Sequence, residues 1–340
     1  MQRPSLNVLA SILSVASSLC APGVVCAQTT YTLTQVGTND GTTSSSATGL
    51  NDEGDIVLTV ESGPTVATYL WHRGTQTNIG GLVPAPQFVE SGGMNDLVQI
   101  VGTTLSPETG SFCAFTWQQG QMIELPSPTG SSAAFGIGDN LLGQVVGVIY
   151  DANGNGEAAL WNQGKLTLLP GIPGGNFSQP GAINIRGEIV GTSQDASGIT
   201  NAVLWRHGAL TVLANNAITG AINDENQVVG TTLTAPASAF LWQNGTRTAL
   251  PPLAGTAGST TASDINDVGE ITGTSSNIAV LWQNGVAINL NDQIAQGDPL
   301  KPYVTLTGAG EVNNLGQILA SGTDARSPAI AQTYLLTPVR

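Results

Sequence analysis

One short run of the chain has the side-chain pattern of a calcium loop. Asp151-Ala152-Asn153-Gly154-Asn155-Gly156 has the D-x-N-x-N-G spacing that places alternate oxygen ligands around Ca²⁺. The twelfth position, where such a loop needs a bidentate glutamate, is Asn162. Asn-Gly pairs also form tight turns without any ion. Asp151, Asn153 and Asn155 are therefore the candidate calcium ligands, an ordinary turn is the alternative, and no other cofactor is expected.

The chain has few residues that could perform nucleophilic catalysis or bind zinc. The chain has two histidines, His72 and His207, and each lies within a Trp-x-x-Gly segment of a different part of the chain. A Ser-His-Asp triad needs its members in contact, and a zinc site needs several His or Cys ligands. Cys113 has no activating cation near it in the sequence, so we expect a buried, unreactive thiol. No catalytic residue is assigned.

Carboxylate pairs and asparagines recur in the same segments. Asp52-Glu53 and Asp224-Glu225 each directly follow an asparagine that repeats along the chain. Paired carboxylates can perform acid–base chemistry, but the repetition favours a solvated turn. The asparagines could also surround a central channel and bind a ligand, although a residue repeated in a turn is more simply explained by the turn.

Two motifs recur in order and define the elements that must position these residues. The first is an asparagine, usually preceded by an apolar residue and followed by a Val/Ile-rich run, and it occurs seven times at spacings of 39 to 47 residues. These residues are Asn51, Asn95, Asn140, Asn184, Asn223, Asn266 and Asn313. The second is Trp-x-x-Gly, which contains every tryptophan of the chain: Trp71, Trp117, Trp161, Trp205, Trp242 and Trp282. A period in the low forties is typical of the four-stranded blade of a β-propeller.

Each repeat divides into four short strands. The first ends at the asparagine, Asn-x-x-Gly turns the chain, and the Val/Ile run forms the second strand. A variable loop follows, and then the Ala-x-Leu-Trp strand, whose hairpin leads to a fourth strand such as 165–169. The third strand is apolar on both faces, which is typical of a fully buried strand. We therefore expect the tryptophans to pack between neighbouring blades.

The two ends of the chain predict that the ring is closed by pairing. The last repeat has no fourth strand after Leu336, whereas residues 31–36 resemble a fourth strand without the first three. The sequence therefore predicts an all-β, seven-bladed β-propeller of four-stranded blades, with the N-terminal strand in the last blade. The long gap before Asn313 contains residues 291–295, which we expect to form a short capped helical turn.

The N-terminal segment and the composition indicate where the protein is found. Residues 1–27 have a basic start, an apolar stretch and small residues before the end, as a secretory signal peptide does, which leaves residues 28–340 as one propeller domain. No later stretch is apolar for the roughly 20 residues that a membrane span requires. The balance of 23 acidic against 9 basic residues disfavours nucleic acid as a partner. We expect a secreted or periplasmic bacterial protein, and the oligomeric state stays open.

The ordered motifs over residues 45–340 resemble the HAF-repeat family of extracellular bacterial proteins. The shared features are Asn-x-x-Gly, a Val-Val-Gly run and an Ala-Phe-Leu-Trp-x-x-Gly segment, which recur in this order along the chain. The resemblance implies export and a propeller-like fold, and it transfers no catalytic residues. This chain departs from the family at the position of its histidine, which here holds Ala67, Cys113, Glu157, Asn201, Ser238 and Ile278.

Two functions are compatible with these features. The first is an exported, non-catalytic binding or scaffold propeller that recognises a glycan, an envelope component or a protein through its variable loops. The second is a hydrolase or lactonase, with or without calcium, whose site lies in the central funnel. Asp, Glu and His converging at one channel mouth would favour the enzyme, whereas Thr, Ser and Gly there would favour the binding protein.

Overall fold

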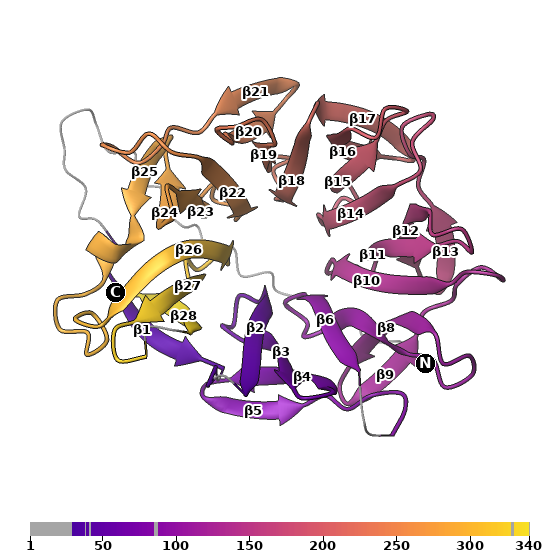
Figure 1. Cartoon of the computed structure of the whole chain (residues 1–340), viewed down its shortest axis with the longest axis horizontal. Coiled ribbons are helices and arrows are strands. Elements are labelled where there is room, and N and C mark those ends of the chain that lie inside the picture. Colours follow the sequence, from indigo (N-terminus) through magenta and orange to yellow (C-terminus); the bar gives the residue numbers. More distant parts are fainter. Residues whose placement is uncertain (1–28, 38, 41, 85–87, 328–329, 340) are drawn as a thin grey trace, which may run out of the picture.

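Seven antiparallel sheets of four strands each are arranged in a ring around a central opening (Figure 1). The computed structural model describes residues 29–37, 39–40, 42–84, 88–327 and 330–339. The predicted seven-bladed β-propeller is therefore confirmed, while the predicted signal peptide, residues 1–27, lies outside the described residues. Within these ranges no helix is long and apolar enough to cross a membrane.

The blades are numbered in chain order of their innermost strands. Blades 1 and 2 contain β2 (Thr43–Leu50), β3 (Ile56–Ser62), β4 (Thr65–His72), β5 (Thr75–Asn78), β6 (Val89–Met94), β7 (Ile100–Leu105), β8 (Phe112–Gln118) and β9 (Gln121–Glu124). Blades 3 and 4 contain β10 (Ala133–Asp139), β11 (Val145–Tyr150), β12 (Gly156–Asn162), β13 (Lys165–Leu168), β14 (Ser178–Ile183), β15 (Ile189–Gln194), β16 (Thr200–Arg206) and β17 (Ala209–Ala214). Blades 5 and 6 contain β18 (Ala217–Ile222), β19 (Val228–Thr232), β20 (Ala239–Gln243), β21 (Thr246–Ala249), β22 (Thr260–Ile265), β23 (Ile271–Ser275), β24 (Ile278–Gln283) and β25 (Val286–Asn289). Blade 7 contains β26 (Val304–Val312), β27 (Ile318–Asp324), β28 (Ala331–Pro338) and, from the other end of the chain, β1 (Tyr31–Val36).

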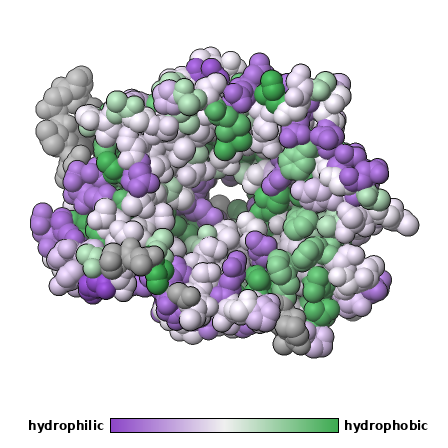
Figure 2. Space-filling view, in the orientation of Figure 1, coloured by the Kyte–Doolittle hydropathy of each residue, from purple (hydrophilic) through white to green (hydrophobic). Residues whose placement is uncertain are grey.

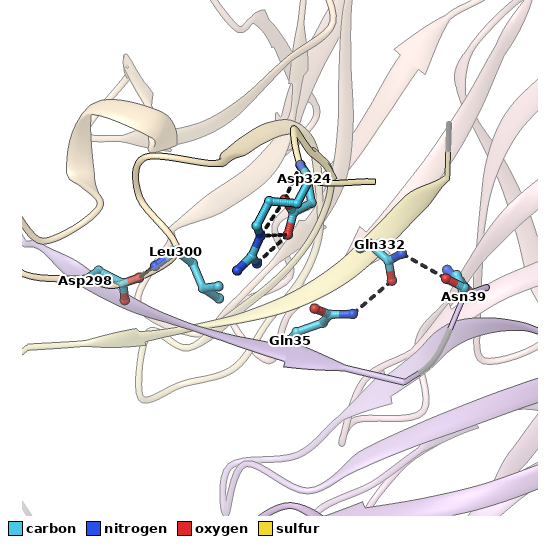
Figure 3. A network of polar contacts seen from close by, with 7 residues as sticks. Gln35, Asn39, Asp298, Leu300, Asp324 and Gln332 are labelled. Carbon is cyan, nitrogen blue, oxygen red and sulfur yellow. Dashed lines mark hydrogen bonds and ion pairs between the residues drawn. The ribbon is translucent and has the colours of Figure 1, made fainter. Parts of the chain in front are cut away.

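The N-terminal strand closes the ring as predicted. β1 pairs antiparallel with β28, so it supplies the outermost strand of blade 7. Polar contacts continue past the strand pair (Figure 3): the Gln35 side-chain amide donates to Gln332 at 3.0 Å, and the Gln332 amide donates to the Asn39 carbonyl at 3.0 Å. The Leu33 backbone N–H donates to the Asp298 carboxylate at 2.7 Å, which ties β1 to the segment before β26.

The tryptophans join neighbouring blades, as the apolar third strands predict. Trp161 packs against Val101, Ala114 and Leu125 of the preceding blade, and its indole N–H donates to the Pro126 carbonyl there at 2.7 Å. Trp205 in blade 4 and Trp282 in blade 6 make the same bond, to Pro170 and Pro251, at 2.8 and 2.7 Å. Each such residue therefore combines apolar burial with a satisfied indole donor.

The glycine that ends the Val/Ile run makes room for the tryptophan and for the innermost strand. At Gly147 in β11, a Cβ atom would overlap the carbonyl oxygen of Phe135 in β10 and lie 2.9 Å from the Trp161 ring. The strands approach too closely at this point for any side chain. The repeated Gly therefore follows from packing.

The predicted capped turn in the long gap is a single turn of 3-10 helix. It spans Leu290–Gln293, one residue earlier than expected, and the Asn289 side chain caps it by accepting from the Asn291 backbone N–H at 3.0 Å. Leu290 is fully buried in the core of blade 7. No α-helix occurs in the described ranges.

Candidate functional site

The repeated asparagines form one turn, which Asn140 illustrates. Its side-chain oxygen accepts from the backbone N–H groups of Leu142 and Gln144, each at 3.1 Å. Its side-chain nitrogen donates to the Gln144 side chain at 2.8 Å and to the backbone carbonyl of Asn184 in the next blade at 2.9 Å. The amide thus makes the turn and also links two blades. An acceptor recurs four residues after each asparagine: Asp55, Gln99, Gln144, Glu188, Gln227, Glu270 and Gln317.

The link between blades repeats around one mouth of the channel. Six of the seven asparagine side chains donate to the backbone carbonyl of the next asparagine around the ring. One of these six is Asn313, which donates to the Asn51 carbonyl at 2.9 Å and joins the last blade to the first. The asparagines surround the channel, but their amides are occupied by these bonds. The turn interpretation is confirmed, and the amides are not free to bind a ligand.

Carboxylates border this mouth, one residue beyond the asparagine ring. Asp52, Asp96, Asp224 and Asp267 line a cavity of about 210 Å³, and they receive backbone hydrogen bonds from neighbouring blades. Burial raises the pKa of Asp96, and the charge of nearby Asp52 adds to this rise. Asp52 and Asp224 therefore do more than solvate a turn, which is what the sequence suggested for them. They make the channel mouth acidic.

Three further carboxyl groups lie deeper, at positions where other blades are apolar or small. Asp264 and Glu311 fall two residues before an asparagine, and this position elsewhere holds Gly49, Gly93, Gly138, Ala182 and Ala221. Asp264 accepts from the backbone N–H groups of Ile265 and Val312, both at 2.8 Å. Burial raises the pKa of Glu311 to about 8, and the neighbouring Asp264 contributes. Both residues, together with Asp139, line a channel cavity of about 360 Å³.

A row of aromatic side chains lies at the opposite ends of the inner strands, where the variable loops are. The row crosses blades 2 to 4, and neighbouring ring centroids are 4.9, 5.9, 5.7 and 6.3 Å apart. Its members are Phe88, Phe112, Phe135, Tyr150 and Phe177. Phe135 lies outside the repeat, because its position in five other blades holds Ser46, Glu90, Gln179, Ile218 and Thr261. Phe88 and Phe177, by contrast, occupy one equivalent position in blades 2 and 4, where each bridges to the preceding blade.

A pocket opens beside the centre of this row. Phe135 and Tyr150 form its apolar wall, and Glu90 and Gln179 are among its polar residues, around a volume of about 260 Å³. Ile137 lines both this pocket and the central channel, so the two spaces adjoin. Figure 2 shows the opening at the centre of the ring. This pocket could not be predicted from the sequence, because its residues come from three separate repeats.

The structure brings the three predicted calcium ligands together in a turn between β11 and β12. The Asp151 carboxylate accepts from the backbone N–H groups of Asn153 and Asn155, at 2.7 and 2.9 Å, and from the Asn155 side chain at 2.9 Å. These bonds lower the pKa of Asp151. Asp195 forms a similar turn in the next blade with Ser197 and Ile199. No group of three or more His, Cys, Asp or Glu residues in the described part of the chain could hold a metal. Calcium binding at this loop remains a prediction.

The histidines and the cysteine lie away from both cavities. His72 ends β4 in blade 1, where its ring contacts Asp55, and His207 lies in an exposed hairpin turn of blade 4. Cys113 is buried, and burial raises the pKa of its thiol to about 12, with Glu124 adding to the shift. The expected unreactive thiol is consistent with this environment.

Comparison with known proteins supports the fold alone. No protein-family model matches the chain, and no curated protein sequence matches it. It is similar to a puromycin-hydrolysing peptidase from Mycobacterium tuberculosis (TM-score 0.56, 11% identity, covering 88% of this chain and 52% of that one). It is also similar to the β-propeller domain of the trilobed protease from Pyrococcus furiosus (TM-score 0.56, 9% identity, covering 86% and 97%). TolB from Acinetobacter baumannii matches with a TM-score of 0.43 at 12% identity, covering 82% of this chain and 61% of TolB. The chain therefore spans about half the length of the peptidase and less than two thirds of that of TolB.

Proposed function

We propose that this protein is an exported binding propeller that recognises a carbohydrate at the aromatic pocket. The observation that supports the proposal is the continuous row of five aromatic side chains on the face that bears the variable loops. Residues that merely build the fold recur from blade to blade in this chain. An aromatic row confined to three blades has no counterpart of that kind. Export rests on the predicted signal peptide.

The pocket has the two components that a sugar requires. The C–H faces of a sugar ring pack on aromatic side chains, which Phe135 and Tyr150 provide. Its hydroxyl groups both donate and accept, which suits the carboxylate of Glu90 and the amide of Gln179. A volume of about 260 Å³ is smaller than the roughly 300–1,000 Å³ of pockets for drug-sized ligands, so one sugar residue is the expected occupant.

Binding to a glycan array, followed by calorimetry on the best ligand, tests this proposal. Tyr150→Ala and Glu90→Gln should each weaken binding by about tenfold or more, because each removes a contact from a desolvated site. Tyr303→Ala is the matched control, since Tyr303 is an exposed aromatic residue in the last blade. Equal binding by Tyr150→Ala and the unaltered protein would reject the pocket. Binding to an envelope protein and to no glycan would mean that the ligand is a protein and not a carbohydrate.

The hydrolase or lactonase alternative is favoured by one observation. Glu311 and Asp264 form a buried carboxyl pair in the channel, and the pKa of Glu311, about 8, suits a general acid near neutral pH. The converging aspartates of the channel mouth match the carboxylate part of the pattern expected for an enzyme, but no histidine of the described residues lines the mouth, and Gly, Ser and Thr line the deeper channel. A panel of lactones and esters tests the alternative. Turnover that Glu311→Gln abolishes would establish it, and turnover that survives this variant would exclude this pair.

A further inference from the structure

Asp139 breaks the repeat at a position that faces the channel mouth. It directly precedes Asn140, and the residue before each of the other asparagines is apolar: Leu50, Met94, Ile183, Ile222, Ile265 and Val312. Most of these side chains are buried in the described structure. Because the fold is built six times with an apolar residue at this position, it has no need of a carboxyl group in blade 3.

The Asp139 carboxyl group is buried without a partner. Neither of its oxygens is accessible to solvent, and neither has a hydrogen-bond partner among the described residues. Burial raises the pKa of this group well above its usual range, and the charge of Asp96 adds to the effect. A buried polar group without a hydrogen-bond partner destabilises a fold. An aspartate here is therefore best explained by a ligand that supplies the missing donors.

The surroundings indicate what kind of ligand this is. Asp139 lines both the mouth cavity and the deeper channel cavity, and its carboxyl oxygens lie beneath the surface of that wall. A ligand that enters past Asp52 and Asp96 therefore reaches these oxygens once the Asp139 side chain turns into the channel. These carboxylates attract a cation. The two unpartnered oxygens call for hydrogen-bond donors, which an organic ammonium ion has and a bare metal ion lacks. Leu141 and Ile185 also line the mouth and offer an apolar surface for a carbon chain.

We propose that the central channel binds the primary ammonium group of a linear alkylamine, with the Asp139 carboxylate as its acceptor. An ammonium group has three N–H donors and a positive charge, and it would satisfy both unpartnered oxygens. The alkyl chain would lie against the apolar residues of the mouth. This site is separate from the aromatic pocket, so the proposal does not depend on carbohydrate binding.

Isothermal titration calorimetry of the whole propeller with 1,5-diaminopentane tests the proposal. The measurement is made at pH 8, which favours the ionised carboxyl group. We expect saturable binding of the diamine. The analogue in which each nitrogen is a quaternary trimethylammonium group should bind at least about tenfold more weakly, because it keeps the charge but has no N–H donor. Equal binding of the two compounds would overturn the proposed hydrogen bonds, and no binding of the diamine at millimolar concentration would overturn the site.

Variants at Asp139 separate this site from general attraction by the acidic surface. Asp139→Asn keeps the shape and Asp139→Leu restores the apolar residue of the repeat; both should lower the affinity for the diamine by about tenfold or more. Asp139→Leu should also raise the melting temperature, which shows that the variant is folded. Glu157→Gln removes an exposed carboxylate in β12 that lines neither channel cavity and should leave binding unchanged. Affinity retained by both Asp139 variants would refute the assignment.

Discussion

At the residue scale, Glu311 should make stability depend on pH. Its pKa is near 4.5 ordinarily and about 8 in the folded protein. Stability associated with this group is therefore fully present below about pH 4.5 and is lost as the pH rises toward 8, because the unfolded chain ionises first. Glu311→Gln keeps an acceptor but cannot ionise, so it should raise the free energy of unfolding at pH 8 by on the order of 2 kcal/mol.

Melting curves of this variant between pH 4 and pH 8 provide the measurement. The gain over the unaltered protein should shrink toward pH 4. Glu157→Gln, which replaces an exposed glutamate in β12, is the control and should leave the pH dependence as it is. The same gain at both pH values would mean that ionisation of Glu311 is not the cause.

The residues that could be predicted from the sequence are those that the repeats share. Asn140 and Trp161 occur at fixed positions, so their roles in turns and in packing follow from repetition. Asp139 and Glu311 are departures from the repeat, and they become visible only when the seven blades are compared position by position. The aromatic row could not be predicted, because only the ring geometry brings Phe112, Phe135 and Phe177 into one line.

At the element scale, the asparagine turn should contribute to stability through two neighbouring blades. Asn140→Ala would remove the acceptor for two backbone N–H groups and the bond to Asn184. We expect the free energy of unfolding to fall by about 3 kcal/mol. Urea denaturation measures this loss, with Asn153→Ala, in an exposed turn, as a control expected to cause a much smaller change.

The close approach of β10 and β11 is a second property of the elements. Gly147→Ala would place a methyl group against the Phe135 carbonyl and the Trp161 ring, so we expect a loss of about 2 kcal/mol. Gly297→Ala is the control, because nothing lies within 4 Å of the position its Cβ would occupy. Thermal melts of the two variants should differ clearly. Equal melts would show that the strands separate without strain.

At the scale of the whole molecule, the closure of the ring joins the two ends of the chain. β1 is the outer strand of blade 7 and buries Tyr31, Leu33 and Val36, and β2, the next strand of the chain, is the inner strand of blade 1. Deleting residues 28–37 should remove apolar burial that stabilises the fold by about 5 kcal/mol. It should also remove the backbone hydrogen bonds between β1 and β28. We expect the melting temperature to fall sharply, and an unchanged melt would contradict the closure.

A peptide supplied separately distinguishes loss of the strand from damage caused by the deletion. Because β1 is held to β28 by backbone pairing and side-chain contacts, a synthetic peptide of residues 29–40 should add to the vacant edge of the truncated protein. It should raise the melting temperature in a concentration-dependent way. The same peptide with Leu33→Asp should not, since Leu33 is buried in the blade 7 core. Rescue by only the unaltered peptide would show that the ring is stabilised by the strand itself, independently of the chain that follows it.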